Sequence, residues 1–202
     1  MTKTQRVRII HDSNSEDPRD WDSPSIIKDT SRSGIIDMKI SLIIQTDGWA
    51  AAQKMLSAAN GDHEPLSYYD YDPEDLSPEE VDSWIERLGD ELIVEDFWIG
   101  DYHYLAWITP TLCAHTGTPW DRARVAMEAD IETFTQWANN DVYGFIIEEW
   151  NPACGCDSCE AGEYIEVESC WGFYGSDPRL NGMADHMTPE QLDMAVKAEV
   201  EY

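Results

Sequence analysis

The chain has 202 residues, of which 41 are Asp or Glu and 13 are Lys or Arg, so its formal net charge at pH 7 is −28. This charge argues against direct binding to nucleic acid, because phosphate binding needs clustered Lys and Arg. The 9 Trp, 9 Tyr and 4 Phe supply enough large side chains for a folded core, which argues against a disordered acidic tail. We expect one domain over residues 1–202.

The sequence also predicts a cytoplasmic protein without a membrane span. No stretch approaches the roughly 18 consecutive apolar residues that a membrane-spanning helix needs, and the first residues lack the pattern of a secretory signal peptide. The chain contains 5 Cys, four of them between positions 154 and 170. An odd number grouped in this way is typical of a reducing compartment rather than of a disulfide framework.

Alternating apolar residues predict two strands in the first part of the chain, at residues 6–11 and 34–44. The segment 12–25 between them is dense in turn-forming residues. A helix should follow over residues 46–60, because the segment is rich in Ala and ends at Asn60 and Gly61.

Residues 62–101 are the acidic centre, with fifteen carboxylates and a single basic residue, Arg87. We interpret this stretch as an acidic insertion that carries a helix over residues 77–89. Ser77 is the expected N-cap, with Pro78 following, and Glu80 completes a capping box. Four apolar residues recur at helical spacing, namely Val81, Trp84, Ile85 and Leu88.

Tyrosines alternate with carboxylates just before this helix. Tyrosines are common anchors at protein interfaces, and spaced carboxylates can stand in for phosphates. We therefore predict a partner-binding surface from this flank and the anionic face of the helix: Tyr68, Tyr69, Asp70, Tyr71, Asp72, Glu74, Asp75, Glu79, Glu80, Asp82 and Glu86. An ordinary solvated helix is the alternative interpretation.

Two strands at residues 92–99 and 102–109 should form a hairpin through Gly100. A loop over 109–120 and a helix over 121–139 follow; the apolar residues of this helix that we expect to be buried are Val125, Ala126, Ile131, Phe134 and Trp137.

A second, longer hairpin is predicted from the strands 142–148 and 164–174. The alternation breaks near the end of the second strand, which indicates either burial on both faces or a bulge at Gly172. The chain should end in a helix over residues 189–199, capped by Thr188 and Gln191. The whole pattern predicts an α+β fold with a mostly antiparallel sheet and three or four helices.

The cysteines Cys154, Cys156, Cys159 and Cys170 have the spacing C-x-C-x2-C-x10-C. We expect no cofactor and favour free thiols, with a structural zinc ion held by these four thiolates as the alternative. Cys170 lies eleven residues beyond Cys159, so Cys113 or His115 is an alternative fourth ligand for that ion.

No recognisable catalytic template occurs in the sequence. His11 with Asp12, and His103 with Asp101, could form acid–base pairs, but a carboxylate near any histidine is expected by chance in so acidic a chain. We therefore predict that the protein is not an enzyme. A Mg²⁺-dependent enzyme built on its carboxylates is the less favoured alternative.

Four segments, EDPRDWDSP, TGTPWDRARV, TQWANNDVYGFII and ESCWGFYG, together resemble a family of small, functionally uncharacterised phage and mobile-element proteins. The final motif, with its aromatic residues and spaced glycines, is the most specific of the four. The resemblance covers about half the chain and leaves the acidic centre without a counterpart. It implies a phage or mobile-element setting, but no activity and no catalytic residues.

Setting and charge together favour an anti-defence protein, an anti-CRISPR or antirestriction inhibitor that mimics DNA. Adaptation to a high-salt cytoplasm is an alternative origin of the acidity, although the many Ile and Trp and the five Cys are not the usual balance of such proteins. The 28 net negative charges equal those of about 14 base pairs of duplex. Such an inhibitor would occupy the nucleic-acid-binding surface of a host defence complex. The alternative is a phage accessory protein with a structural zinc site in the cysteine hairpin and a regulatory role.

Overall fold

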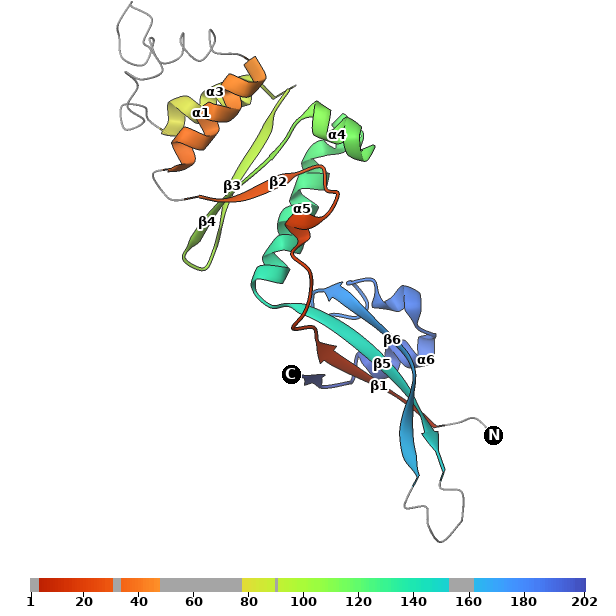
Figure 1. Ribbon diagram of the computed structural model, residues 1–202. Coiled ribbons are helices and arrows are strands. Elements are labelled where there is room, and N and C mark those ends of the chain that lie inside the picture. The colour runs from red at the N-terminus through yellow and green to blue at the C-terminus, as the bar shows by residue number, and fades with distance from the viewer. Residues whose placement is uncertain (1–3, 31–33, 48–77, 90, 153–161) are drawn as a thin grey trace, which may run out of the picture. The chain divides into compact units, whose positions relative to one another are not determined.

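The structure of the protein is a computed structural model that describes residues 4–30, 34–47, 78–89, 91–152 and 162–202 (Figure 1). The described residues form five α-helices and seven β-strands, and every strand pair except one is antiparallel. The predicted α+β fold is thus confirmed, with more helices than expected and with two sheets in place of one. No helix in this part of the chain is long and apolar enough to cross a membrane.

The chain divides into two compact units, one of residues 1–20 with 133–202 and one of residues 21–132. We call them the first and the second unit. The prediction of a single domain with an acidic insertion at 62–101 stays a prediction, since two such units can belong to one domain or to two.

The first unit is built on a four-stranded sheet of order β6-β5-β1-β7. Its strands are β1 (Gln5–His11), β5 (Val142–Asn151), β6 (Glu163–Tyr174) and β7 (Val200–Glu201). β7 pairs in parallel with β1, and the other pairs are antiparallel. The strand predicted at 6–11 and the long hairpin of 142–148 with 164–174 are confirmed.

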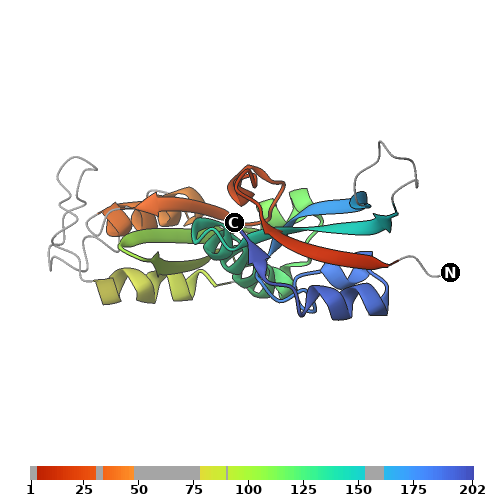
Figure 2. The ribbon, with the colours of Figure 1, turned by 90° about the horizontal axis from the view of Figure 1, so that it is seen from below.

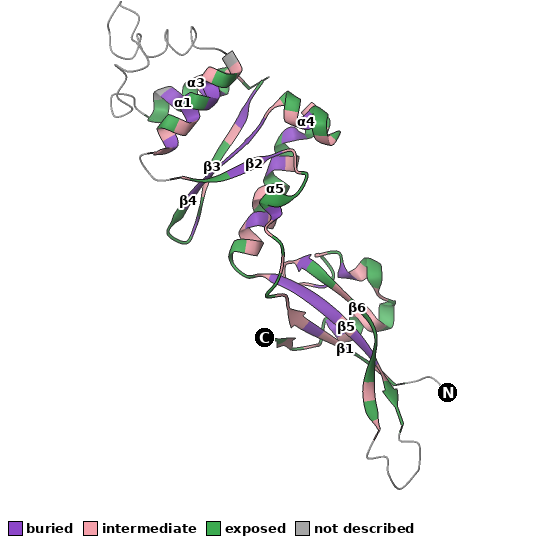
Figure 3. Cartoon of the chain, viewed as in Figure 1, coloured by how far each residue is buried: buried purple, intermediate pink, exposed green. Residues whose placement is uncertain are grey.

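One face of this sheet packs against the 3-10 helix η4 (Met183–His186) and the helix α6 (Pro189–Ala195), as Figure 2 shows. The core residues are Val7, Ile9, Tyr143, Phe145, Ile147, Phe173, Met183 and Ala195. β5 is buried along most of its length, whereas β6 is largely exposed (Figure 3). The predicted capping box of Thr188 and Gln191 is present, although α6 ends before residue 199.

The predicted bulge at Gly172 is also confirmed. Trp171 and Gly172 together lie opposite Gly144 of β5, and Gly172 has a φ of 84°, which favours glycine. The indole of Trp171 covers the backbone at Gly144. A Cβ atom on residue 144 would lie 2.3 Å from that ring, so the close approach requires glycine at this position.

The second unit contains a three-stranded antiparallel sheet of order β2-β4-β3. Its strands are β2 (Ile26–Thr30), β3 (Ile93–Ile99) and β4 (Tyr102–Ile108). The hairpin predicted from the strands at 92–99 and 102–109 is confirmed, and Gly100 at its turn has a φ of 58°. The sequence did not predict β2, because the turn-forming residues that precede it obscure a strand of only five residues.

The strand predicted over residues 34–44 is wrong, because these residues belong to the helix α1 (Gly34–Asp47). This run is apolar at most positions, so it satisfies the strand pattern and the helix pattern equally well. Tertiary packing decides between them. Ile35 and Leu42 pack against the sheet, while Ile40 and Ile43 pack against the helix α3 (Pro78–Arg87).

The helix α3 confirms the prediction for residues 77–89, and Val81 and Ile85 are buried beneath it. The helix predicted over residues 46–60 lies outside the described residues, apart from its first two positions, which end α1.

The loop predicted over residues 109–120 is wrong, since most of it forms the helix α4 (Pro110–Thr116). Thr109 caps this helix by accepting a hydrogen bond from the backbone N–H of Leu112, and Gly117 ends it with a φ of 75°. These are ordinary start and stop signals that the sequence carries.

The helix α5 (Ala123–Ala138) confirms the prediction for residues 121–139, and the 3-10 helix η3 (Trp120–Arg122) precedes it. A further 3-10 turn, η1 (Pro18–Asp20), lies in the first unit. Within α5 the burial of Phe134 is confirmed, but Val125 is 66% exposed, and Ala123 and Met127 are buried in its place. The buried stripe therefore starts at Ala123 and not at Val125.

Candidate functional site

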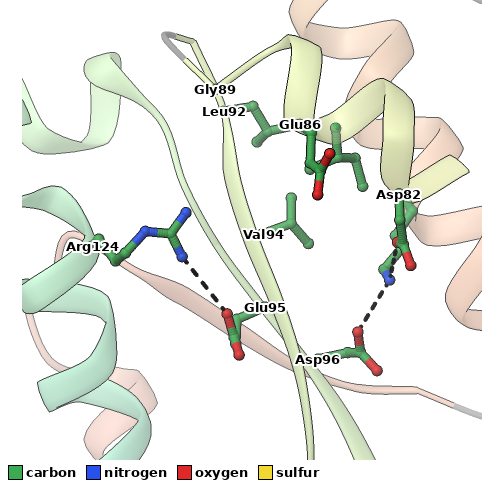
Figure 4. A pocket seen from close by; sticks show the side chains of 10 residues that line it. Asp82, Glu86, Gly89, Leu92, Val94, Glu95, Asp96 and Arg124 are labelled. Carbon is green, nitrogen blue, oxygen red and sulfur yellow. Dashed lines mark hydrogen bonds and ion pairs between the residues drawn. The ribbon is translucent and has the colours of Figure 1, made fainter. Parts of the chain in front are cut away.

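A cavity of about 400 Å³ lies along the edge of β3 in the second unit (Figure 4). The helices α1 and α3, the strand β3 and the start of α5 contribute its walls. Its charged side chains are Lys39, Asp82, Glu86, Glu95, Asp96 and Arg124, and its apolar ones are Ile85, Leu92 and Val94. We call this cavity the β3 groove.

A second cavity of similar size, about 440 Å³, lies near the start of α4 in the same unit. Glu91 is the only charged residue among those that line it. The β3 groove therefore offers the richer set of charged groups.

Lys39 is the centre of the groove, and packing between α1 and α3 places it there. Its side chain is buried, and its Nζ atom donates hydrogen bonds to Asp82 at 2.7 Å and to Asp96 at 3.1 Å. Burial works to lower the pKa of Lys39, but the hydrogen bonds and charges of the two carboxylates outweigh it and raise the pKa above its ordinary value. Lys39 is thus a fixed cation that holds two helices and the sheet together.

Asp96 connects the groove to His103 on the neighbouring strand. The Nε2 atom of His103 lies 3.1 Å from Asp96, and its ring stacks on Trp98 with centroids 4.1 Å apart. Burial works to raise the pKa of Asp96, but the hydrogen bonds from Lys39 and His103 outweigh it and lower the pKa. Among the described residues, the buried Nδ1 atom of His103 has no hydrogen-bond partner. The ring is therefore held by its one bond to Asp96 and by the stacking.

The remaining charges of the groove are less tightly held. Arg124 at the start of α5 lies 3.9 Å from Glu95, and both side chains are exposed. Glu86 is exposed and forms no ion pair with another described residue. Four carboxylates therefore face two cations that are already paired, which leaves the β3 groove with a surplus of negative charge.

The first unit contains an ion network with a carboxylate at its centre, where the β3 groove has an ammonium group. The buried carboxylate of Glu148 lies between Arg6 and Arg8, and Arg8 also donates to Glu201 of β7 with an Nε–Oε1 distance of 2.8 Å. The guanidinium of Arg6 also lies over the ring of Tyr164, 4.1 Å from its centroid. Two cations and two carboxylates balance each other in this network.

The predicted partner-binding residues fall into two groups. Those of the tyrosine-rich flank, Tyr68, Tyr69, Asp70, Tyr71, Asp72, Glu74 and Asp75, lie outside the described residues. The others belong to α3: Glu79 is exposed, Glu80 is placed only by its backbone, and Asp82 and Glu86 lie in the β3 groove. Asp82 is half-exposed and already paired with Lys39.

The predicted zinc ligands also divide into residues that the structure describes and residues that it does not. Cys154, Cys156 and Cys159 lie outside the described residues, while Cys170 on β6 packs against the core of the first unit. Cys113 is buried in α4, where burial raises the pKa of its thiol. Within the described part of the chain no group of three or more His, Cys, Asp or Glu side chains could hold a metal ion. The zinc site stays a prediction.

The two histidine pairs suggested by the sequence have other partners. His11 lies 2.7 Å from the backbone oxygen of Asn140, and His103 interacts with Asp96. Neither bond is to the neighbouring Asp12 or Asp101.

Sequence reasoning missed Lys39. Its partners lie 43 and 57 residues away, beyond the reach of local patterns. A single lysine inside a mostly apolar run was the available signal, because a lysine buried in such a place needs an anionic partner.

The chain matches no protein-family model, and comparisons with curated proteins and with solved structures find no match either. The resemblance to phage and mobile-element proteins stays a prediction.

Proposed function

We propose that this protein is a non-catalytic acidic inhibitor that binds the nucleic-acid-binding surface of a host restriction or CRISPR complex. Its carboxylates would take the place of phosphates in front of the Lys and Arg side chains of that surface. The proposal places the protein in the cytoplasm of the host cell, where such complexes meet DNA.

One observation carries the proposal: most of the basic side chains that the structure describes are neutralised by carboxylates of the same chain. Ion pairs with carboxylates of the same chain occupy seven basic side chains, namely Arg6, Arg8, Arg19, Lys39, Arg124, Arg179 and Lys197. Many carboxylates remain exposed without an ion pair among the described residues, among them Glu79, Glu86, Glu91, Glu163 and Glu168. The surface therefore presents unneutralised negative charge, which attracts a basic partner and repels nucleic acid.

The charge also has the size that mimicry requires, since it equals that of about 14 base pairs. A uniformly acidic surface would improve solubility without binding any partner. Mimicry differs in that specific carboxylates must matter more than others, so the test must compare sets of carboxylates of equal charge.

The test measures the affinity of the purified protein for purified restriction and CRISPR complexes between low and high salt, together with inhibition of their DNA binding. We expect the affinity to fall steeply with salt and DNA to compete for the same surface. A variant in which Asp70, Asp72, Glu74 and Asp75 become Asn or Gln should bind at least about tenfold more weakly.

A matched control replaces Asp20, Asp185, Glu163 and Glu168 of the first unit, which removes the same charge elsewhere. Equal losses in both variants would indicate non-specific attraction. A salt-independent affinity, or the absence of inhibition across the whole panel, would contradict the proposal.

The cysteine spacing favours a second candidate function, a regulatory module stabilised by zinc. Asn151 and Glu163 pair at the end of the β5–β6 hairpin, so three cysteines belong to the connection between these strands. Metal analysis of protein purified without chelators should find close to one equivalent of zinc. Replacing Cys156 by Ser should remove the metal; protein that contains no zinc before the substitution would exclude this candidate.

A further inference from the structure

Among the described strands of the second unit, β3 is an edge strand beside the groove. β3 pairs with β4 on one side, and among the described residues no strand pairs with its other side. In an antiparallel pair, alternate residues point their N–H and C=O groups away from the partner strand. Val94, Glu95 and Asp96 line the β3 groove (Figure 4), and we infer that the backbone groups of this segment that face away from β4 are available to a strand there.

The other long edge of the protein is unsuited to pairing. β6 is also an edge strand, but its register with β5 shifts at two places, and it exposes Glu163, Glu166 and Glu168. Bulges and charges are the means by which proteins prevent a sheet edge from pairing. β3 also exposes carboxylates, Glu95 and Asp96, but its pairing with β4 shows no register shift, so its regular backbone is the edge that can accept a strand.

The side chains beside the edge of β3 determine which side chains a strand added to that edge would meet. Val94 and Asp96 point to the face of the sheet that bears Asp82 of α3, whereas Glu95 points to the face that bears Arg124 of α5. Alternate side chains of an added strand would point in the same two directions. Every second residue would therefore meet the α3 side of the groove.

The α3 side favours long basic side chains. Ile85, Leu92 and Val94 supply an apolar wall for the methylene groups of Lys or Arg, and Glu86 supplies a carboxylate that no described residue pairs. Lys39 is already bound to two carboxylates and does not offset Glu86. An acidic or neutral segment would leave this charge without a partner.

We propose that the β3 groove is a docking site for an extended segment of the partner protein that adds to β3 as a strand and carries Lys or Arg at alternate positions. This inference rests on the proposed function and specifies its binding mode. The strand hydrogen bonds provide affinity, and the alternating cations provide specificity.

The test uses three ten-residue peptides and the full-length protein. One alternates Lys and Val, one has the same composition with the lysines and valines in two blocks, and one alternates Glu and Val. Calorimetry at physiological salt should give about tenfold tighter binding for the alternating lysine peptide than for the block peptide, and none for the glutamate peptide. Amide hydrogen exchange should slow within residues 93–99.

A pair of variants separates this groove from the acidic surface in general. Glu86→Lys places a cation in the groove and should weaken peptide binding at least about tenfold. Glu132→Lys makes the same change at an exposed position of α5 outside the groove, and should alter binding less than about twofold because charges are screened over about 8 Å at this ionic strength. Circular dichroism checks that both variants keep the fold.

Equal binding of the alternating and block peptides would overturn the inference, as would protection of β2 or β6 amides without β3, or equal effects of the two variants. The proposed function has a separate test. If Glu86→Lys still inhibits a defence complex fully, the strand-docking inference is wrong but the proposed inhibitor function is retained. If the alternating lysine peptide binds but no complex is inhibited, the β3 groove is a docking site and the proposed inhibitor function is wrong.

Discussion

Each of the two units contains an ion network, and the central groups of the two networks have opposite charges. In the first unit the carboxylate of Glu148 lies between two arginines, and Glu201 balances the second of them. In the second unit the ammonium of Lys39 lies between two aspartates, and nothing among the described residues balances the nearby Glu86. The first network is neutral, whereas the second retains negative charge beside an open strand.

This difference separates stabilising charges from charges that are available for binding. A balanced network joins strands of the same unit and leaves no charge for a partner. The surplus in the β3 groove costs some stability through repulsion, so we expect the two networks to respond differently when a single member is removed.

The largest effect should come from Lys39→Met. The substitution keeps the length of the side chain but leaves Asp82 and Asp96 facing each other without a cation. Breaking a fully buried pair costs about 3–5 kcal/mol, and the partial exposure of the two aspartates reduces our expectation to about 2 kcal/mol. Urea denaturation measures the loss in the free energy of unfolding.

Lys28→Met is the matched control, because Lys28 is exposed in the same unit and its Nζ atom lies 5.6 Å from the ring centroid of Trp107 without an ion pair to any described residue. It should cost less than about 1 kcal/mol. Similar losses for the two lysines would show that Lys39 is not a central support of the second unit.

A smaller effect is expected from Glu148→Gln in the first unit. The amide keeps the shape of the carboxylate but loses its charge, and Arg6 and Arg8 are exposed enough to be solvated. We expect a loss of about 1 kcal/mol in the free energy of unfolding. A loss larger than that of Lys39→Met would reverse our ranking of the two networks.

The smallest effect should appear in the acid range. The pKa of Asp96 in the folded protein is below its ordinary value of 3.8, so its ionised form contributes stability above that pH, and the contribution is lost as the pH falls through the folded pKa. Because the side chain is 41% exposed, we expect only a few tenths of a kcal/mol. Asp96→Asn should flatten the decline in stability below about pH 4.

Thermal melts of wild type and Asp96→Asn between pH 3 and pH 6 provide the measurement, with Asp101→Asn as a control that removes an exposed carboxylate of the nearby turn. If both variants keep the slope of the wild type, the lowered pKa of Asp96 does not contribute to acid stability.

Local patterns predicted the elements that are bounded by clear turn or cap signals. The strands of the two hairpins are runs of β-branched and aromatic residues joined by turn-forming residues, α3 is amphipathic, and α6 is capped by Thr188, so each was predicted near its observed start. α1 was mistaken for a strand because its residues are apolar on several sides, and only its packing between the sheet and α3 distinguishes the two conformations. α4 was missed although Thr109 and Gly117 signal its ends.

The candidate site was predicted only in part. Asp82 and Glu86 were recognised by their place on an amphipathic helix, which is a local property. Lys39, Glu95 and Arg124 come together only through the folding of α1, β3 and α5, so no spacing in the sequence relates them. The open edge of β3 is likewise a property of strand order and not of any single strand.

The two register shifts of β6 have a practical consequence for engineering. Ile165 and Val167 of β6 are 43% and 53% exposed. Without its two register shifts and its glutamates, β6 would be an aggregation-prone edge strand. The glutamates and the irregular backbone of β6 prevent another strand from pairing with it. A redesign that reduced the acidity of the protein should therefore leave β6 unchanged, because removing its glutamates and register shifts would favour pairing of this edge with a second copy of the chain.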